Sequence, residues 1–354
     1  MMDVAARVAG FCARFGVRVP VLMAPMAGAC PPGLAAAVAD AGGMGACGAL
    51  LLDADGIAGW ARAVRARSNG AFQVNLWIPD PAPVRDPAHE AALRSFLGTW
   101  GPEVAAEAGD AAPVDFDMQC EAVLAAGPAV VSSIMGLYPP AFVARLKMRG
   151  IAWFATVTTV AEARAAEAAG ADVVVAQGAE AGGHRGAFEA GAAERGMVGL
   201  VSLLPAVADA VRVPVVATGG IADGRGVAAA LVLGASAVQV GTGFLRCPEA
   251  GVAWADALAQ AAPEGTMVTR AFSGRAGRAL ATAYVQAAAD GPAPAPYPVQ
   301  RGLTAGMRGA GVAAGDVDQM QAWAGQSAGL ARAEAAGAVV ERLWQEARGL
   351  LGMG

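Results

Sequence analysis

The chain has 354 residues, 56% of them hydrophobic, and a formal net charge of −5 at pH 7. The negative charge and the lack of a basic cluster argue against nucleic-acid binding. The most apolar stretch, residues 228–245, is interrupted by Gly, Ser, Gln and Thr, so we expect no membrane-spanning helix and no membrane partner. Residues 1–16 carry an Asp and two Arg where a signal peptide needs an apolar segment, which predicts a cytoplasmic protein.

The cysteines are odd in number, far apart and not arranged in CxxC pairs. They are Cys12, Cys30, Cys47, Cys120 and Cys247. This spacing predicts reduced, mostly buried thiols and neither a disulfide framework nor a metal site.

Short apolar runs that end in turn residues recur along the first three quarters of the chain. The predicted strands lie within residues 19–28, 42–50, 71–78, 129–135, 151–157, 172–178, 213–220 and 235–244. Near-continuous apolar runs are typical of parallel strands that are buried on both faces. Ala-rich helical patterns lie between them, as in residues 31–43, 158–170 and 223–234. Eight strand–loop–helix units predict a (β/α)8 TIM barrel. An open doubly wound sheet is the alternative, but no GxGxxG fingerprint follows the first strand.

Two segments interrupt this repeat. Residues 79–118 are rich in Pro at their start, contain His89 and predict a partly helical insertion after strand three. After residue 262 we expect no further strands, a Pro-rich loop at 291–299 and a helical tail from about 316. We therefore expect a barrel in residues 1–262, and a smaller helical cap formed by the insertion and by residues 263–354.

Active sites of such barrels lie where strands end and loops begin. Gly219 and Gly220 follow strand seven, and Gly241 and Thr242 follow strand eight. Bare backbone N–H groups at these two strand ends are typical of a phosphate site, although each pair alone could be an ordinary turn. At the end of strand one, the backbone of Met23 and Ala24 could face a flat ligand.

Two amides and one histidine stand out among the remaining strand ends. Asn75 and Gln177 are polar residues in apolar strands, so they either form a structural network or contact the polar edge of a flavin ring. His184 is flanked by Gly182, Gly183 and Gly186, which would let the backbone approach a ligand closely. Histidine suits proton transfer near neutral pH. We therefore expect His184 to lie over a cofactor, although a lone histidine is more often structural.

Together these segments resemble one family. "APMAG", "QVNLW", "QGAEAGGHRGAF", "ATGGIADGRG", "QVGTGF", "AFSGRAGR" and "WAGQ" are similar to segments of the nitronate monooxygenases, formerly called 2-nitropropane dioxygenases, across residues 17–328. The resemblance implies non-covalently bound FMN. Gly219, Gly220, Gly241 and Thr242 would bind its phosphate, with Gln239 and Val240 on the same strand, and Asn75, Gln177 and Gly182 would contact the flavin.

The resemblance also implies the reaction. The family oxidises alkyl nitronates such as propionate 3-nitronate: one electron passes to the flavin, O2 reacts, and a carbonyl compound and nitrite form. His184 matches the catalytic histidine; neutral, it could take a carbon proton from a nitroalkane, and protonated, it could hold the nitronate. Trp323 and Gln326 of "WAGQ" would bound the substrate pocket. Residues 130–136 and the absence of Asn near position 282 depart from the family pattern, which affects the expected substrate more than the cofactor.

Three alternatives remain. An FMN-dependent NAD(P)H reductase of the same superfamily, acting on quinones or enoyl-(acyl carrier protein), is the nearest; we expect the acyl reductases to carry Glu at position 177 and no Arg after the histidine, whereas this chain has Gln177 and Arg185. An inosine-monophosphate-dehydrogenase-like barrel would need a catalytic Cys after strand six, and none is present. A non-catalytic ligand-binding protein is the third. The sequence leaves the oligomeric state open, a homodimer included.

Overall fold

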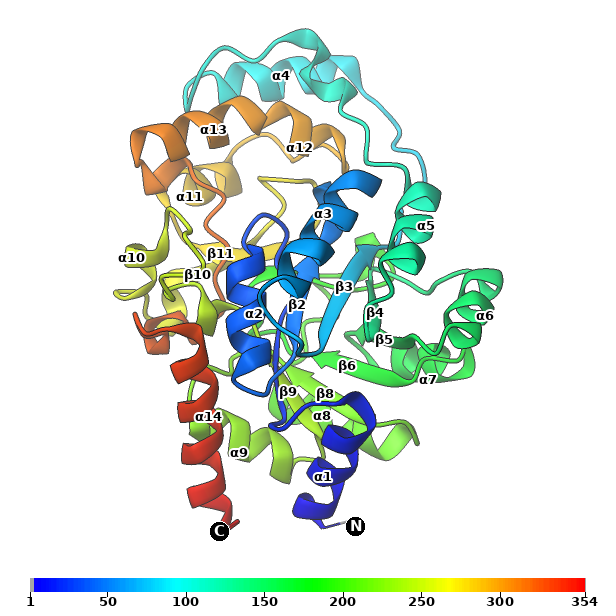
Figure 1. Ribbon diagram of the computed structural model, residues 1–354. Helices are drawn as coiled ribbons and strands as arrows, with labels where there is room; N and C mark the ends of the chain where they lie inside the picture. The colour runs from blue at the N-terminus through cyan, green and yellow to red at the C-terminus, as the bar shows by residue number, and fades with distance from the viewer. Residues whose placement is uncertain (1–2, 354) are drawn as a thin grey trace.

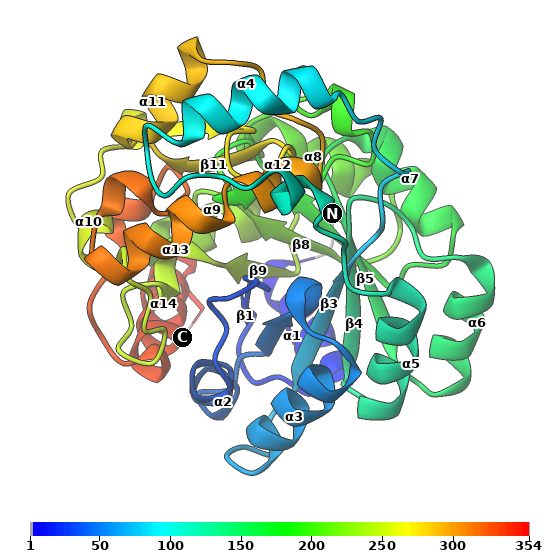
Figure 2. The same ribbon diagram turned by 90° about the horizontal axis from the view of Figure 1, so that it is seen from above.

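The computed structural model describes residues 3–353, and its centre is a parallel eight-stranded sheet with the order β1-β9-β8-β6-β5-β4-β3-β2. A parallel bridge between Leu22 and Met44 joins the two edge strands, so the sheet closes into a barrel. The strands are β1 (Val21–Met23), β2 (Gly45–Gly48), β3 (Phe72–Trp77), β4 (Val130–Ile134), β5 (Ala152–Val157), β6 (Val173–Gln177), β8 (Val215–Thr218) and β9 (Ala237–Val240). Each lies within a predicted range, so the (β/α)8 barrel is confirmed (Figures 1 and 2).

Helices surround this barrel. They are α2 (Pro32–Asp40), α3 (Ala54–Arg65), α5 (Phe116–Ala126), α6 (Pro140–Met148), α7 (Val160–Ala168), α8 (Leu200–Ala210), α9 (Gly224–Val232) and α14 (Ala336–Leu351). Side chains fix several of their starts: Thr159 accepts a hydrogen bond from the Glu162 N–H at the start of α7, and Asp223 accepts one from the Gly226 N–H at the start of α9. Glu162 returns to the Thr158 N–H at 2.6 Å, one residue before the position that a capping box predicts.

The amino-terminal end of the barrel is covered by α1 (Val4–Phe15). Phe11 and Phe15 of this helix pack against Phe154 of β5, with ring centroids 6.3 and 4.9 Å away. All three rings are buried. Because this end is filled with side chains, a ligand can enter the barrel only from the opposite, carboxyl end.

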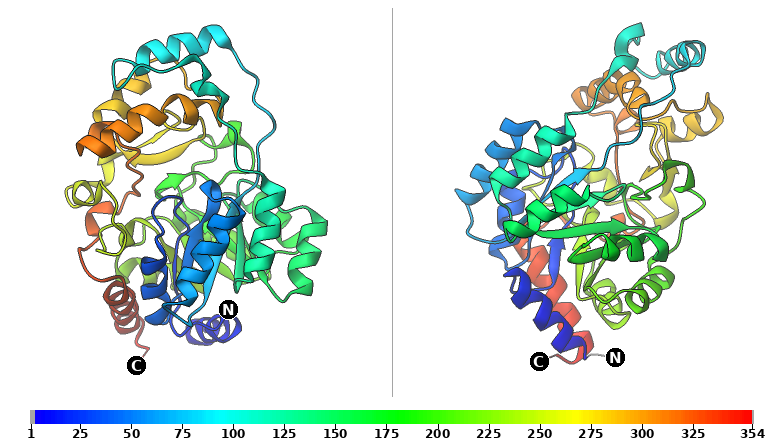
Figure 3. Two further views of the ribbon diagram at one scale, coloured as in Figure 1. Left: turned by 45° about the horizontal axis from the view of Figure 1, so that its top comes forward. Right: turned by 90° about the vertical axis from the view of Figure 1, so that its right-hand side faces the viewer.

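A cap covers the carboxyl end (Figures 1 and 3). It contains α4 (Pro87–Leu97), α11 (Ala283–Asp290), α12 (Val299–Leu303), α13 (Ala305–Ala314) and a sheet of β10 (Thr266–Thr269), β11 (Gly277–Leu280) and β7 (Gly183–His184). The expectation of no strands after residue 262 was therefore wrong. The runs 266–269 and 277–280 are only four residues long and partly polar, so they lack the apolar signal of the barrel strands.

Short segments complete the chain. These are α10 (Ala255–Leu258) and the 3-10 helices η1 (Ala49–Leu51), η2 (Ala106–Asp110), η3 (Ala190–Ala192), η4 (Thr242–Phe244), η5 (Pro263–Gly265), η6 (Val317–Gln319) and η7 (Ala328–Leu330). The tail after residue 316 is thus not one helix. Its middle, between η6 and α14, is mostly extended or turning chain that reaches back from the cap to the barrel.

The last helix also departs from the predicted division of the chain. Helix α14 packs on α9 and α2 at the side of the barrel, away from the cap (Figure 1). Similarly, α5 begins at Phe116, inside the predicted insertion, and packs on α3. The cap therefore consists of residues from about 79 to 115 and from about 263 to 330, and α14 supplies the eighth helix of the barrel.

Two further expectations concern the cysteines and membrane-spanning helices. Cys30, Cys47, Cys120 and Cys247 are buried, Cys12 is half-buried, and all five are free thiols, as predicted. Across residues 3–353, no helix has both the length and the apolar character needed to cross a lipid bilayer.

The position of α14 leads to a stability prediction. Leu343 is fully buried in its contact with the barrel, whereas Leu350 of the same helix is 62% exposed. Leu343→Ala should lower the free energy of unfolding by about 2–4 kcal/mol because it leaves a cavity. Leu350→Ala should change it by less than about 0.5 kcal/mol. Urea unfolding of both variants measures the difference, and equal effects would show that α14 does not stabilise the barrel.

Candidate active site

A cavity of about 720 Å³ lies between the carboxyl ends of the strands and the cap. Twelve of the residues singled out from the sequence line it: Ala24, Asn75, Gln177, Gly182, Gly183, His184, Gly219, Gly220, Gln239, Gly241, Thr242 and Trp323. These residues come from the ends of five barrel strands and from the segment that returns from the cap. The structure thus brings residues that are up to 299 positions apart in the chain to one cavity.

Three of the selected residues do not line the cavity. Met23 is buried and its carbonyl accepts a hydrogen bond from the Gln73 side chain, while the Val240 carbonyl accepts one from the Ala24 N–H. Gln326 donates its backbone N–H to Glu180 at 3.0 Å, and its side chain is not in the cavity wall. The role of the Gln326 side chain toward the substrate stays a prediction. Gln321 supplies an amide to the wall in its place.

His184 is held by a strand pairing between the barrel and the cap. It lies opposite Gly277 in the antiparallel β7–β11 pair, and Arg185 continues this pairing by donating its N–H to Ala276. Gly182 precedes the pair and passes so close to the segment from Trp323 onward that an added Cβ would lie 2.4 Å from the Gly325 nitrogen. Gly182, two positions before the histidine, is therefore required by close backbone packing.

Gln177 and Arg185 fix the rest of the histidine loop. The Gln177 amide donates to the His184 carbonyl at 3.0 Å and accepts from the Gly186 N–H at 2.8 Å. The buried Arg185 guanidinium donates to the carbonyls of Gln177 and Gly196 at 2.5 and 2.9 Å. Both bonds of the Gln177 amide are used within the protein, which favours the structural interpretation of this residue.

Aromatic rings surround the His184 imidazole. Its centroid lies 4.8 Å from that of Trp77 and 4.8 Å from that of Trp323. Its Nε2 lies 2.7 Å from the Ser273 hydroxyl, which leaves Nδ1 as the ring nitrogen available to a substrate. Burial, reinforced by the charges of Arg275 and Arg301, lowers the pKa of His184 to about 3. The imidazole is therefore neutral at pH 7. This does not support the second role considered for His184, in which a protonated ring holds the nitronate.

The amides at the base of the cavity form a second network. Gln73 donates to the Met23 carbonyl and to the side-chain oxygen of Gln239, both at 3.1 Å. Because Gln239 uses its oxygen in this contact, its amide nitrogen remains available toward the cavity. Asn75 donates to the Ser132 hydroxyl at 3.1 Å and keeps its own oxygen as an acceptor. These two amides retain the hydrogen-bonding capacity that a planar, polar ligand edge requires.

The glycine side of the cavity lies at the ends of β8 and β9. Gly219 and Gly220 have φ angles of 117° and 67°, a backbone conformation that favours glycine. Ser327 donates to the Gly220 carbonyl at 2.7 Å, and Thr242 accepts from the Gly325 N–H at 3.0 Å. The returning segment therefore packs against both glycine turns and fixes this wall.

The sequence analysis missed several residues that form the site. They are Trp77, Met135, Ser273, Arg301 and Arg308. Trp77 follows Asn75 by two positions and so shares its face of β3, a signal that was available. Met135 has φ 72°, the sole non-glycine residue with a positive φ among residues 3–353, and it lies in the stretch that departs from the family pattern. Backbone strain of this kind concentrates at functional sites but leaves no sequence signal.

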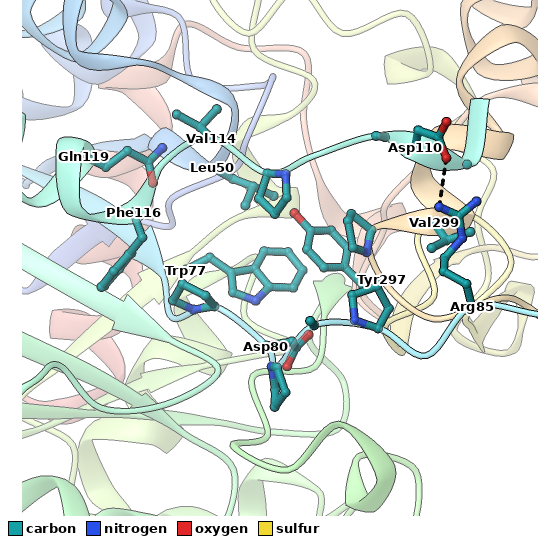
Figure 4. Close-up of a pocket in the computed structure, with 18 residues that line it drawn as sticks. Leu50, Trp77, Asp80, Arg85, Asp110, Val114, Phe116, Gln119, Tyr297 and Val299 are labelled. Carbon is teal, nitrogen blue, oxygen red and sulfur yellow. Dashed lines mark hydrogen bonds and ion pairs between the residues drawn. The ribbon is translucent and has the colours of Figure 1, made fainter. Parts of the chain in front are cut away.

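Beside the main cavity is a smaller one of about 300 Å³, to which both Trp77 and Leu50 also contribute (Figure 4). The Trp77 indole stacks on the Tyr297 ring with centroids 4.9 Å apart. Near this stack, the buried Arg275 guanidinium donates to both carboxylate oxygens of Asp80, at 2.8 and 2.5 Å. This ion pair joins the insertion to the segment just before β11, the strand that pairs with His184, and it places a positive charge near Trp77 and the imidazole.

Comparison with known proteins identifies the family. The model of the nitronate monooxygenase family matches residues 11–346. The chain belongs to the nitronate monooxygenase family. A nitronate monooxygenase of Pseudomonas aeruginosa is 41% identical over 355 residues, covering 96% of this chain and 99% of the relative.

Solved structures agree with this assignment. The nitroalkane oxidase from Streptomyces ansochromogenes superposes with a TM-score of 0.86 at 38% identity, covering 96% of this chain and 99% of that one. FabK from Thermotoga maritima superposes with a TM-score of 0.76 at 28% identity, covering 97% of each chain. The protein is thus an oxidoreductase of the nitronate monooxygenase family, and it acts on small-molecule substrates.

The second departure from the family pattern has a structural explanation. Thr282 lies in the region where the family resemblance implied an Asn, and its hydroxyl accepts a long hydrogen bond, 3.5 Å, from the Val285 N–H at the start of α11. Thr282 does not line the cavity. Thr282 therefore caps a helix of the cap and does not contribute to the cavity wall of this family member.

The environment of His184 leads to a prediction about stability. As pH falls below about 6.5, the unfolded chain protonates this histidine, whereas the folded protein does so only near pH 3. The folded state binds fewer protons in this window, so His184 should make the wild-type protein lose up to about 1.4 kcal/mol of unfolding free energy per pH unit between pH 6 and pH 4.

Urea unfolding of wild-type and His184→Asn proteins at pH 7.5, 6 and 5 tests this prediction. The variant should lose less stability on acidification than the wild type does. His89→Asn, which removes the histidine of α4 outside the cavity, is the matched control. Equal pH dependence in the wild-type and His184→Asn proteins would show that the imidazole titrates as it does in the unfolded chain.

Proposed function

We propose that this protein binds FMN and oxidises alkyl nitronates, such as propionate 3-nitronate, with O2 to a carbonyl compound and nitrite. The observation that carries the proposal is the cavity itself, in which a histidine between two indoles lies in one wall and two glycine turns lie in another. The family membership supports the nitronate chemistry, and the remainder of the proposal rests on how well the residues fit the cofactor and substrate.

The cavity fits FMN in size and in the chemistry of its walls. Its volume of about 720 Å³ lies within the range of about 300–1,000 Å³ that is common for small-molecule and cofactor sites. The turns at Gly219–Gly220 and Gly241–Thr242 offer backbone groups without bulky side chains for one phosphate. Asn75 and Gln239 offer amide groups to the polar edge of the ring. No dinucleotide fingerprint is present, which favours FMN over FAD.

Bound FMN would supply the electron-transfer chemistry, and the protein supplies binding, orientation and proton handling. Trp77 and Trp323 both contact the His184 ring and give it apolar neighbours in the cavity wall. Ser273 fixes the ring through Nε2, so Nδ1 can face a substrate proton. With a neutral imidazole, His184 can accept the carbon proton of a nitroalkane, whereas a nitronate has already lost that proton.

An NAD(P)H-dependent reductase is the second candidate, which the likeness to FabK favours. Gln177 and Arg185 argue against it. The Gln177 amide uses both of its polar ends within the histidine loop, and Arg185 is buried against the Gln177 carbonyl. The hydrogen bonds of this loop need an amide at position 177 and a guanidinium at position 185. A loop with Glu at the first position and no Arg at the second, as we expect in the acyl reductases, could not form the same bonds.

Gly241 offers a test of cofactor binding. A Cβ at this position would make only ordinary contacts, 3.4 Å from Ala24 and 3.5 Å from Met26, so the side chain of Gly241→Val should be tolerated by the fold and extend into the cavity. We expect the wild-type protein to release FMN on heating and the variant to retain little of it. Mass spectrometry of the released cofactor measures both.

Gly265→Val is the control for Gly241→Val, because Gly265 lies outside the cavity and nothing lies within 4 Å of its Cβ position. It should retain FMN as the wild type does. Finding FAD in the wild-type protein, or full FMN retention in Gly241→Val, would contradict the proposed phosphate site.

The reaction class is tested by anaerobic mixing of the FMN-loaded protein with a nitronate and, separately, with NADH. We expect bleaching of the flavin by the nitronate and not by NADH. His184→Asn should slow bleaching by a neutral nitroalkane by about 10²- to 10⁴-fold, the contribution of a general base, and should affect the preformed nitronate much less.

Each contrary outcome has a distinct meaning. Bleaching by NADH alone would identify a reductase. Equal losses with nitroalkane and nitronate in His184→Asn would assign the imidazole to binding or to the flavin, and unchanged rates would make it a structural residue.

A further inference from the structure

Two arginines line the cap side of the main cavity. Arg301 belongs to α12 and Arg308 to α13, and seven positions separate them. This spacing corresponds to about two helical turns, so consecutive helices present both side chains to the same side. Both helices lie above the barrel, whereas the glycine turns end strands within it (Figure 1). The arginines therefore belong to a different wall from the proposed phosphate site.

Arg308 is held in place by neutral groups. Its guanidinium donates to the Thr304 hydroxyl at 3.1 Å, to the Gln321 side-chain oxygen at 3.1 Å and to the Arg301 carbonyl at 2.9 Å. None of these partners carries a negative charge. Burial and the neighbouring Arg301 lower the pKa of Arg308 to about 10, so it remains charged at pH 7. Its position is fixed and its charge is not compensated.

Arg301 is less constrained. Within residues 3–353 its guanidinium forms no hydrogen bond or ion pair, although its charge is close enough to lower the pKa of both His184 and Arg308. The described residues that line the cavity include no Asp or Glu. Two cations facing a partly enclosed cavity without a counter-ion are unfavourable, because each has lost part of its hydration. A bound anion would remove this penalty.

We propose that Arg301 and Arg308 bind the carboxylate at the end of the substrate away from its reacting carbon, so that the enzyme selects nitronates with a second negative charge. This inference rests on the proposed nitronate oxidation. The pairing is chemically suited, since guanidinium groups bind carboxylates through two parallel, charge-assisted hydrogen bonds. The position is suited as well, because Arg301 and His184 line the same cavity and can contact opposite ends of one ligand.

A matched pair of substrates isolates the carboxylate. Propionate 3-nitronate has a carboxylate at the position where propyl-1-nitronate has a methyl group. Arg301→Gln should lower kcat/KM for propionate 3-nitronate by roughly 10- to 100-fold, mainly through KM, because it removes a charged hydrogen bond. For propyl-1-nitronate, kcat/KM should change less than about threefold, because this substrate has no carboxylate for Arg301 to bind. Arg301→Lys should restore part of the loss.

Binding without turnover separates this inference from the proposed reaction. Succinate has the shape of propionate 3-nitronate with a carboxylate in place of the nitronate, and butyrate lacks the distal charge. Calorimetry of the FMN-loaded protein should show tighter binding of succinate than of butyrate, and Arg301→Gln should remove the difference. Arg94→Gln, on α4 and outside the cavity, is the control and should keep it.

These measurements can overturn the inference in three ways. Equal losses with both nitronates would assign Arg301 to the reacting end. Loss of FMN in Arg301→Gln and Arg301→Lys, with the fold retained, would assign the arginines to the cofactor phosphate. A change in NADPH affinity without a change in succinate binding would assign them to a nucleotide. Should the protein fail to oxidise any nitronate, the succinate–butyrate difference would still support a carboxylate site.

Discussion

The short antiparallel pairing between β7 and β11 is the constraint on which the site depends. It places His184 opposite Gly277, and so it joins a loop of the barrel to a strand that lies about 90 residues later in the chain. Through this pairing the imidazole reaches Ser273 and comes to lie between an indole from β3 and an indole from the returning segment. Without it, the residues that surround the ring would have no fixed relation to it.

This arrangement separates two tasks that one histidine could otherwise combine. Burial and the charges of Arg275 and Arg301 keep His184 neutral, so its ring offers an unprotonated nitrogen but no positive charge that would attract an anion. The positive charge of the cavity wall comes from the guanidinium groups of Arg301 and Arg308. Arg301, one of these two cations, also lowers the pKa of His184 beside it.

The sequence predicted the barrel well because buried parallel strands leave long apolar runs. All eight runs contain the observed strands, and the glycine turns and His184 follow from the rule that barrel chemistry lies at strand ends. The cap was harder to predict. Its strands are short and partly polar, and the segment after η6 is ordered by contacts with Gly182 and Thr242 that no local pattern encodes. Gln321 was not predicted for the same reason, since only the path of this segment brings it to the cavity wall.

The position of α14 has a consequence for how the protein is made. The barrel's strands are complete at Val240, but the helix that covers α9 and α2 comes about 100 residues later, after the cap. The ribosome therefore synthesises the whole cap before α14, and during this time the apolar surfaces of α2 and α9 remain uncovered. Exposed surfaces of this kind make a nascent chain prone to aggregation and a client for chaperones until its last helix emerges.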